Sequence, residues 1–403
     1  MNDHVRRNAL LLAGCLVMNS AAFQLAAALA SVTLVAVTGV QGILGLGPAI
    51  FLASGALAVG PAGRLSDRTG RTPIIGGAFV VGAAGSAIVA AGCAATSAVL
   101  VCFGLVLLGG AVATVLLSRA AAAEMFPPDR RARGMSFVLF GAVSGAIWGP
   151  LIFGPLFAHR STDAASLAAP WLLAIPFMAV GAVIALLVRP DPKTISARYA
   201  PTADDDPAAA PLRVVLKRPG VPAALVAVVA SFAVMASVMN LSGYVAFGRG
   251  HHQDDVFTMI SVHIVGMYGL VLVVGDLIDR FGRRRALVGG LALMTVSNAA
   301  LVWLGGVGGM SLALLGLGLG WCFSYVAATT ELVQLTSPSE RGRLVGFSDL
   351  CASLTAAALA LGGGVVYSDA GVAALALSAA ALAALPALWL AARPAPQPLP
   401  ATE

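Results

Sequence analysis

The sequence predicts an all-α membrane protein with twelve transmembrane helices in two six-helix bundles, and three observations lead to this fold class. Of the 403 residues, 59% are hydrophobic and only 10% are charged, whereas a soluble globular domain has roughly 25% charged residues. The apolar residues fall into twelve runs of membrane-crossing length. A charged motif occurs at residues 63–71 and again at 275–283, so that the runs divide into two sets of six.

The twelve predicted spans follow from the rule that about 20 mostly apolar residues cross a bilayer. They cover residues 8–32, 36–61, 74–94, 98–122, 135–158, 169–188, 220–243, 256–275, 286–304, 309–333, 344–367 and 371–392. Gly and Pro inside these runs are compatible with spanning helices because neighbouring helices satisfy the freed backbone groups. The first run has a basic start but is long enough to span, so we expect an uncleaved helix rather than a signal peptide.

The positive charges predict the orientation. The net charge is +6 and the pI is about 9.4, but the basic residues lie in short loops between spans, which indicates membrane topology rather than nucleic-acid binding. Of the loop Lys and Arg residues, one side of the bundle receives only Arg160 and Arg249. Basic loops stay in the cytoplasm, so we expect a multi-pass membrane protein with both termini there.

The domain organisation follows from one long polar segment, residues 189–219, whose Pro, Asp and Ala content is typical of a mobile cytoplasmic linker. We expect an N-terminal six-helix bundle at 1–188 and a C-terminal one at 220–403. The duplicated motif supports this division, since "GRLSDRTGR" and "GDLIDRFGR" agree at six of nine positions. Two bundles of six helices form the parallel-repeat layout of secondary transporters, which are not enzymes.

The duplicated motif resembles the signature loop between the second and third helices of the major facilitator superfamily. In that family the acidic and basic residues of the loop form cytoplasmic ion pairs that latch the two halves in the outward-open state. The resemblance implies a gating role for Asp67, Arg71, Asp279 and Arg283. It also implies alternating access around a central site. The simpler alternative is that the Arg residues only set topology.

Two helical faces carry candidate metal ligands. Met235 and Met239 are four residues apart in the seventh predicted span, and His263 and Met267 are four apart in the eighth. Residues at i and i+4 share a helix face, and thioether and imidazole ligands suit Cu(I). Met is also an ordinary core filler, so packing alone accounts for a single Met pair. An ionisable side chain inside a span is costly, which favours a functional role for His263.

The paired MxxxM and HxxxM motifs resemble those of the CcoA-like copper importers of the same superfamily. The resemblance implies Met235, Met239, His263 and Met267 as metal-binding residues, copper as the transported substrate, and no resident cofactor. It implies further that copper crosses the bacterial cytoplasmic (inner) membrane and is delivered to the cytoplasm for cytochrome oxidase assembly; the identity of a copper chaperone as partner stays open. The same branch includes relatives that carry riboflavin, so a riboflavin-like solute stays an alternative cargo.

Other ionisable residues lie in or beside the predicted spans. Arg119, Glu331 and Asp349 are candidates for a substrate or proton route because buried charges in spans usually serve one. The outer loop residues His251, His252, Asp254 and Asp255 are candidates for metal capture, with a solvated polar loop as the alternative. The five cysteines form no CxxC motif, and Cys93 and Cys102 are the pair that could meet in a disulfide.

Two further functions remain open from the sequence. "GAIWGPLIFG" at 145–154 partly resembles the Gly-rich antiporter motif of drug exporters, which favours proton-coupled multidrug exchange. A sensor or assembly partner that does not transport is the third class, and the duplicated loop argues against it. Copper uptake by cells distinguishes copper import from proton-coupled multidrug exchange.

Overall fold

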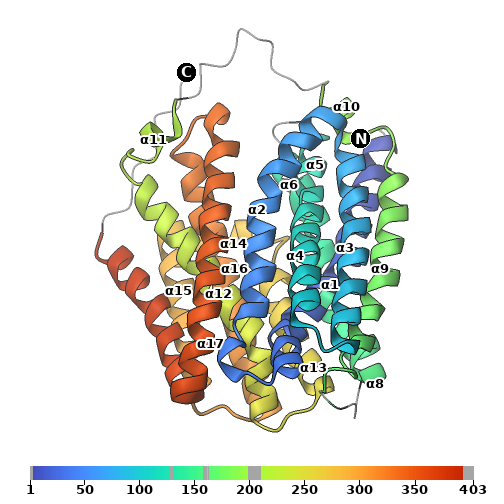
Figure 1. The fold of residues 1–403 in the computed structure, drawn as a ribbon. Coiled ribbons are helices and arrows are strands. Elements are labelled where there is room, and N and C mark those ends of the chain that lie inside the picture. The colour runs from blue at the N-terminus through green and yellow to red at the C-terminus, as the bar shows by residue number, and fades with distance from the viewer. Residues whose placement is uncertain (1–2, 128–129, 158–160, 162, 198–209, 394–403) are drawn as a thin grey trace.

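The computed structural model describes residues 3–127, 130–157, 161, 163–197 and 210–393, and every regular element among these residues is helical. The fold class is therefore confirmed. The N-terminal half holds α1 (Asp3–Thr38), α2 (Leu46–Thr69), α3 (Arg71–Ala94), α4 (Ala98–Val115), α5 (Ser118–Glu124), α6 (Arg131–Phe140), α7 (Gly145–Trp148), α8 (Gly154–Phe157) and α9 (Ala168–Leu186). Figure 1 shows these helices as one bundle, in blue to green, beside a second bundle in yellow to red.

The C-terminal half repeats the arrangement. It holds α12 (Val221–Gly248), α13 (Gln253–Tyr268), α14 (Val274–Phe281), α15 (Arg283–Ala300), α16 (Val307–Gln334) and α17 (Pro338–Ala391). The linker contributes two short helices, α10 (Pro192–Ser196) and α11 (Leu212–Val215); residues 198–209 of the predicted linker and Arg160 of the predicted loop lie outside the described residues.

Nine helical segments of the described chain are long and apolar enough to cross a membrane. The twelve predicted spans are more numerous for two reasons. The label α17 covers two helices, which correspond to the last two spans, 344–367 and 371–392, and are separated by a kink at the non-helical residue Gly371. The eighth and ninth spans correspond to α13, which has only 16 residues, and α15, which begins with three Arg residues.

Several predicted spans also break where the backbone changes geometry. The fourth span is divided between α4 and α5. The fifth continues from α6 through a short 3₁₀ segment, Gly141–Ser144, and a π-helical turn, Gly149–Phe153. Pro150 in this turn has no N–H to donate, which favours the wider turn.

The two halves contact each other closely at the end of the bundle remote from both termini, here called the distal end (Figure 1). The Ser31 hydroxyl of α1 donates to the carbonyl of Asn240 on α12 at 3.3 Å. Gln24 Nε2 donates to Ser261 Oγ on α13 at 2.8 Å. Gly45, just before α2, lies directly against the backbone of α17.

The opposite end, which carries the termini, is here called the terminal end. A cavity of about 600 Å³ opens there, among the residues that join α14 to α15 and the last turn of α16. The linker is attached to the C-terminal half at this end, because the Arg218 guanidinium donates twice to the Glu340 carboxylate, at 2.6 and 2.8 Å. If the termini are cytoplasmic, close contact at the distal end corresponds to an inward-facing state.

Candidate functional site

The four predicted metal ligands lie in the protein interior. Met235 and Met239 on α12 are each 1% exposed, and Met267 on α13 is 2% exposed. His263, one turn before Met267, is fully buried. None of the four side chains is therefore turned toward lipid.

The imidazole of His263 is fixed by one hydrogen bond. Its Nδ1 lies 2.7 Å from the carbonyl oxygen of Leu314 on α16. A carbonyl only accepts, so Nδ1 must carry the proton, and in the neutral imidazole Nε2 keeps its lone pair. Nε2 is buried and has no hydrogen-bond partner among the described residues. A histidine held through one nitrogen, with the other free to coordinate, is the usual arrangement of a metal ligand.

Close helix packing sets the position of this histidine. A Cβ added at Gly318 on α16 would lie 2.6 Å from the carbonyl oxygen of His263. A Cβ at Gly266 on α13 would lie 2.6 Å from the carbonyl oxygen of Leu315. These contacts are too short for any side chain, so glycine at both positions lets α13 and α16 approach closely enough for the imidazole to reach Leu314.

The ligand set would be soft. Within the described part of the chain, no three His, Cys, Asp or Glu side chains gather to hold a metal ion. A site at His263 would therefore depend on thioether sulfur, which favours Cu(I) over harder ions. Joint coordination of one ion by Met235, Met239, His263 and Met267 stays a prediction.

Arg119 and Asp349, predicted separately, form an ion pair between the two halves. Arg119 Nη2 on α5 lies 3.4 Å from Asp349 Oδ2 on α17. The Tyr325 hydroxyl on α16 donates to Asp349 Oδ1 at 2.8 Å. The pairing joins residues 230 positions apart, and nothing local in the sequence indicates it.

Sequence reasoning missed the aromatic residues around this pair. Trp321 stacks on Tyr325 with ring centroids 5.1 Å apart, and Tyr268 meets Trp321 edge-on at 5.8 Å. Trp321 Nε1 is buried without a hydrogen-bond partner among the described residues. The i, i+4 spacing of Trp321 and Tyr325 is the signal that could have found this cluster. Stacked rings with an open N–H donor suit a planar organic solute.

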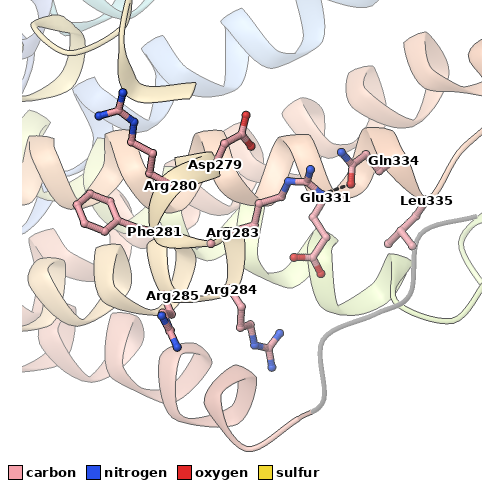
Figure 2. Close-up of a pocket in the computed structure, with 10 residues that line it drawn as sticks. Asp279, Arg280, Phe281, Arg283, Arg284, Arg285, Glu331, Gln334 and Leu335 are labelled. Carbon is pink, nitrogen blue, oxygen red and sulfur yellow. Dashed lines mark hydrogen bonds between the residues drawn. The ribbon is translucent and has the colours of Figure 1, made fainter. Parts of the chain in front are cut away.

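Three of the four predicted gating residues make contacts within their own half in this conformation, and the fourth, Asp279, is exposed at the cavity of the terminal end. Arg71 pairs with Asp67 at 2.8 Å and with Glu124 on α5 at 2.6 Å. In the second half, Arg283 donates to the side-chain oxygen of Gln334 on α16 (Figure 2). The latch between halves that the family resemblance implies belongs to another state and stays a prediction.

Glu331, the third candidate of the route, is 9% exposed near the terminal end of α16 and lines the cavity there. It is thus separate from the Arg119–Asp349 pair. Figure 2 shows its carboxylate below Arg283 and Gln334.

The four candidates for metal capture lie where α12 turns into α13. His251 Nε2 contacts the carbonyl of Gly305 at 2.7 Å, and its Nδ1 lies 4.0 Å from Asp255. The backbone N–H of His252 donates to Asp255 at 3.1 Å, as in a helix cap. Asp254 Oδ1 is buried without a hydrogen-bond partner in the described residues. These contacts explain the loop structurally, and metal capture there stays a prediction.

Cys93 and Cys102, the pair that could have met in a disulfide, are not bonded to each other. All five cysteines are free thiols. Cys93 is fully buried on α3, whereas Cys102 is partly buried on α4.

Comparisons with known proteins agree with this architecture. The family model described as Major Facilitator Superfamily matches residues 9–331 and 258–403. The riboflavin transporter RfnT of Brucella anthropi is 32% identical over 289 residues, which is 70% of each chain. The uncharacterised transporter YddS of Bacillus subtilis is 28% identical over 86% of this chain and 81% of its own. A D-xylose–proton symporter structure superimposes with a TM-score of 0.72 at 15% identity, covering 95% of this chain and 96% of that one.

Proposed function

Because this chain belongs to the major facilitator superfamily and is a secondary transporter, we propose that its cargo is copper, carried as Cu(I). Transport would run across the bacterial cytoplasmic membrane into the cytoplasm by alternating access, to supply cytochrome oxidase assembly. The comparisons support the transporter class; the choice of copper depends on the site.

One observation carries the choice of cargo: the buried, unpartnered Nε2 of His263. A buried polar atom without a partner costs free energy, on the order of 1–3 kcal/mol. A cation that binds the lone pair would offset this cost. Met267 lies one helical turn away, and Met235 and Met239 provide two further buried thioethers. These neutral ligands leave the charge on the ion, so an inside-negative membrane potential would favour its entry.

A second cargo, a planar organic solute such as riboflavin, has support of its own. The relative RfnT is named a riboflavin transporter. The rings of Trp321, Tyr325 and Tyr268 offer stacking surfaces, and Trp321 Nε1 is an unpartnered donor. Proton-coupled exchange of other organic compounds would use the same cluster, with Asp349 as the titratable group.

Uptake into proteoliposomes separates these cargoes. We expect radioactive Cu(I) to enter with the unmodified protein, and His263→Ala or Met235→Leu to lower uptake at least about tenfold, since each removes one ligand. Met178→Leu is the matched control, because Met178 is equally buried but lies on α9 in the other half. Riboflavin uptake is measured in parallel.

Two results would reject copper as cargo. One is unchanged copper uptake after simultaneous substitution of Met235, Met239, His263 and Met267 in a folded protein. The other is saturable riboflavin uptake by the unmodified protein, without copper uptake and with loss on Trp321→Leu.

A further inference from the structure

The first turn of the helix after the duplicated motif is capped by a carboxylate in the N-terminal half. Gly70 has φ +105° and leads into α3. The linker residue Asp191 accepts hydrogen bonds there from the N–H groups of Arg71, at 3.1 Å, and Thr72, at 2.8 Å. The N–H groups at a helix start have no intrahelical acceptors, so an anion satisfies them.

The equivalent turn in the C-terminal half has the same kind of backbone, but no carboxylate of the described residues caps it. Gly282 has φ +87° and leads into α15. No acceptor reaches the N–H of Arg283 or Arg284 within the described part of the chain.

A cavity of about 600 Å³ lies at this uncapped turn. It is lined by four arginines, Arg280, Arg283, Arg284 and Arg285, against two carboxylates, Asp279 and Glu331. The lining of the cavity therefore carries an excess of positive charge. Figure 2 shows the side chains of Arg284 and Arg285 extending from the same side of the turn.

Two arginines at this turn differ in how far their hydrogen-bonding groups are used. Arg284 Nη2 donates to the carbonyl of Arg393 at 2.7 Å, which leaves its other donors available. Arg283 Nε is buried and has no partner among the described residues. Gly282 has no atom within 4 Å of an added Cβ, so the turn is open to a ligand.

We infer that this cavity is a binding site for a phosphate-type oxyanion, held by the first N–H groups of α15 and by Arg284 and Arg285. The anion replaces the carboxylate that Asp191 supplies in the other half. Two sources share this chemistry: the headgroup of an anionic phospholipid and a soluble phosphate. The inference is independent of the transported cargo.

The test uses the full chain purified in detergent. Inorganic phosphate is titrated against chloride at equal ionic strength, and the thermal unfolding midpoint is followed. In parallel, the protein is placed in nanodiscs of phosphatidylcholine with and without phosphatidylglycerol. We expect a saturable rise of the midpoint with phosphate, with phosphatidylglycerol, or with both. An effect of phosphatidylglycerol alone identifies a lipid headgroup, and an effect of phosphate identifies a soluble anion.

The variants assign the site. Arg284→Gln together with Arg285→Gln should weaken the apparent affinity at least about tenfold, because charge-assisted hydrogen bonds are lost. Arg285→Gln alone changes an exposed side chain, and it replaces the double variant in the test if the double variant does not fold. The matched control is Arg213→Gln, an exposed arginine of α11 outside the cavity. The inference is overturned if neither anion raises the midpoint, or if the control weakens binding as much as the cavity variants.

Discussion

Gly45 offers a direct test of how the halves close at the distal end. A Cβ added there would lie 2.0 Å from the carbonyl oxygen of Ala360 and 2.7 Å from its carbonyl carbon. Real Cβ contacts are essentially never shorter than 3.0 Å, so Gly45→Ala requires the two halves to separate by roughly 1 Å at this point. Both partners are backbone atoms, which cannot rotate away as a side chain would.

The magnitude follows from overpacking, which costs about 1–3 kcal/mol when backbone must move. Because the conformations of a transporter differ by only a few kcal/mol, this cost shifts their ratio by about 5- to 150-fold. We therefore expect Gly45→Ala to depopulate the closed distal end and to slow the transport cycle. The fold should survive, since the contact is broken in any state that opens this end.

The assay is a distance distribution between spin labels at the terminal end, after the native cysteines are replaced. Thr69 on α2 and Gly342 on α17 are exposed positions, one in each half. Opening one end closes the other in alternating access, so the label distance should shorten in Gly45→Ala. Gly42→Ala is the matched control, because nothing lies within 4 Å of a Cβ at Gly42. Equal distributions in the two variants would refute the reasoning.

The remaining predictions concern polar contacts. Asp349→Asn removes the ion pair with Arg119; at about one-third exposure of both side chains we discount the full Coulomb energy, on the order of 4 kcal/mol, to about 1–2 kcal/mol. The ratio of the two conformations in the spin-label distance distribution should then change about 5- to 30-fold. An unchanged distribution contradicts the role of the pair. Glu340→Gln removes the negative charge and one of the two oxygens that accept from Arg218, and should lower the free energy of unfolding by about 1–3 kcal/mol in thermal or chemical unfolding; a stability equal to that of the unmodified protein contradicts this. Asp191→Ala removes the carboxylate that accepts from the first N–H groups of α3, at a cost of about 1 kcal/mol, and should create a second phosphate site in the anion titration; a single site in that variant contradicts the equivalence of the two turns.

The helices and the internal repeat could be predicted because both depend on local properties. Hydropathy defines a span, and the matched glycines at 70 and 282 do adopt positive φ in both halves. The last two spans were predicted as separate helices, and a single residue, Gly371 with φ +76°, separates them in place of a loop. Hydropathy alone does not reveal that one residue is enough to connect two helices.

The residues of the candidate site could be predicted from the sequence, but their contacts could not. Burial of His263 and the three methionines follows from their position in apolar spans. The partner of His263, the carbonyl of Leu314, could not be read from the sequence because a backbone acceptor leaves no residue signature. Long-range pairing has the same difficulty, since Arg119 and Asp349 each have several opposite charges available.

The uninterrupted course of α17 before its glycine has a mechanical consequence. Ala360 packs against Gly45 at the distal end, and Asp349 pairs with Arg119. The two residues are eleven positions apart on this one helix, roughly 16 Å along its axis. A continuous helix of that length moves as a rigid body, so a displacement at one contact also displaces the other. A substitution at either contact should therefore weaken both. Combining Gly45→Ala with Asp349→Asn should shift the free-energy difference between the conformations by less than the sum of the two separate shifts.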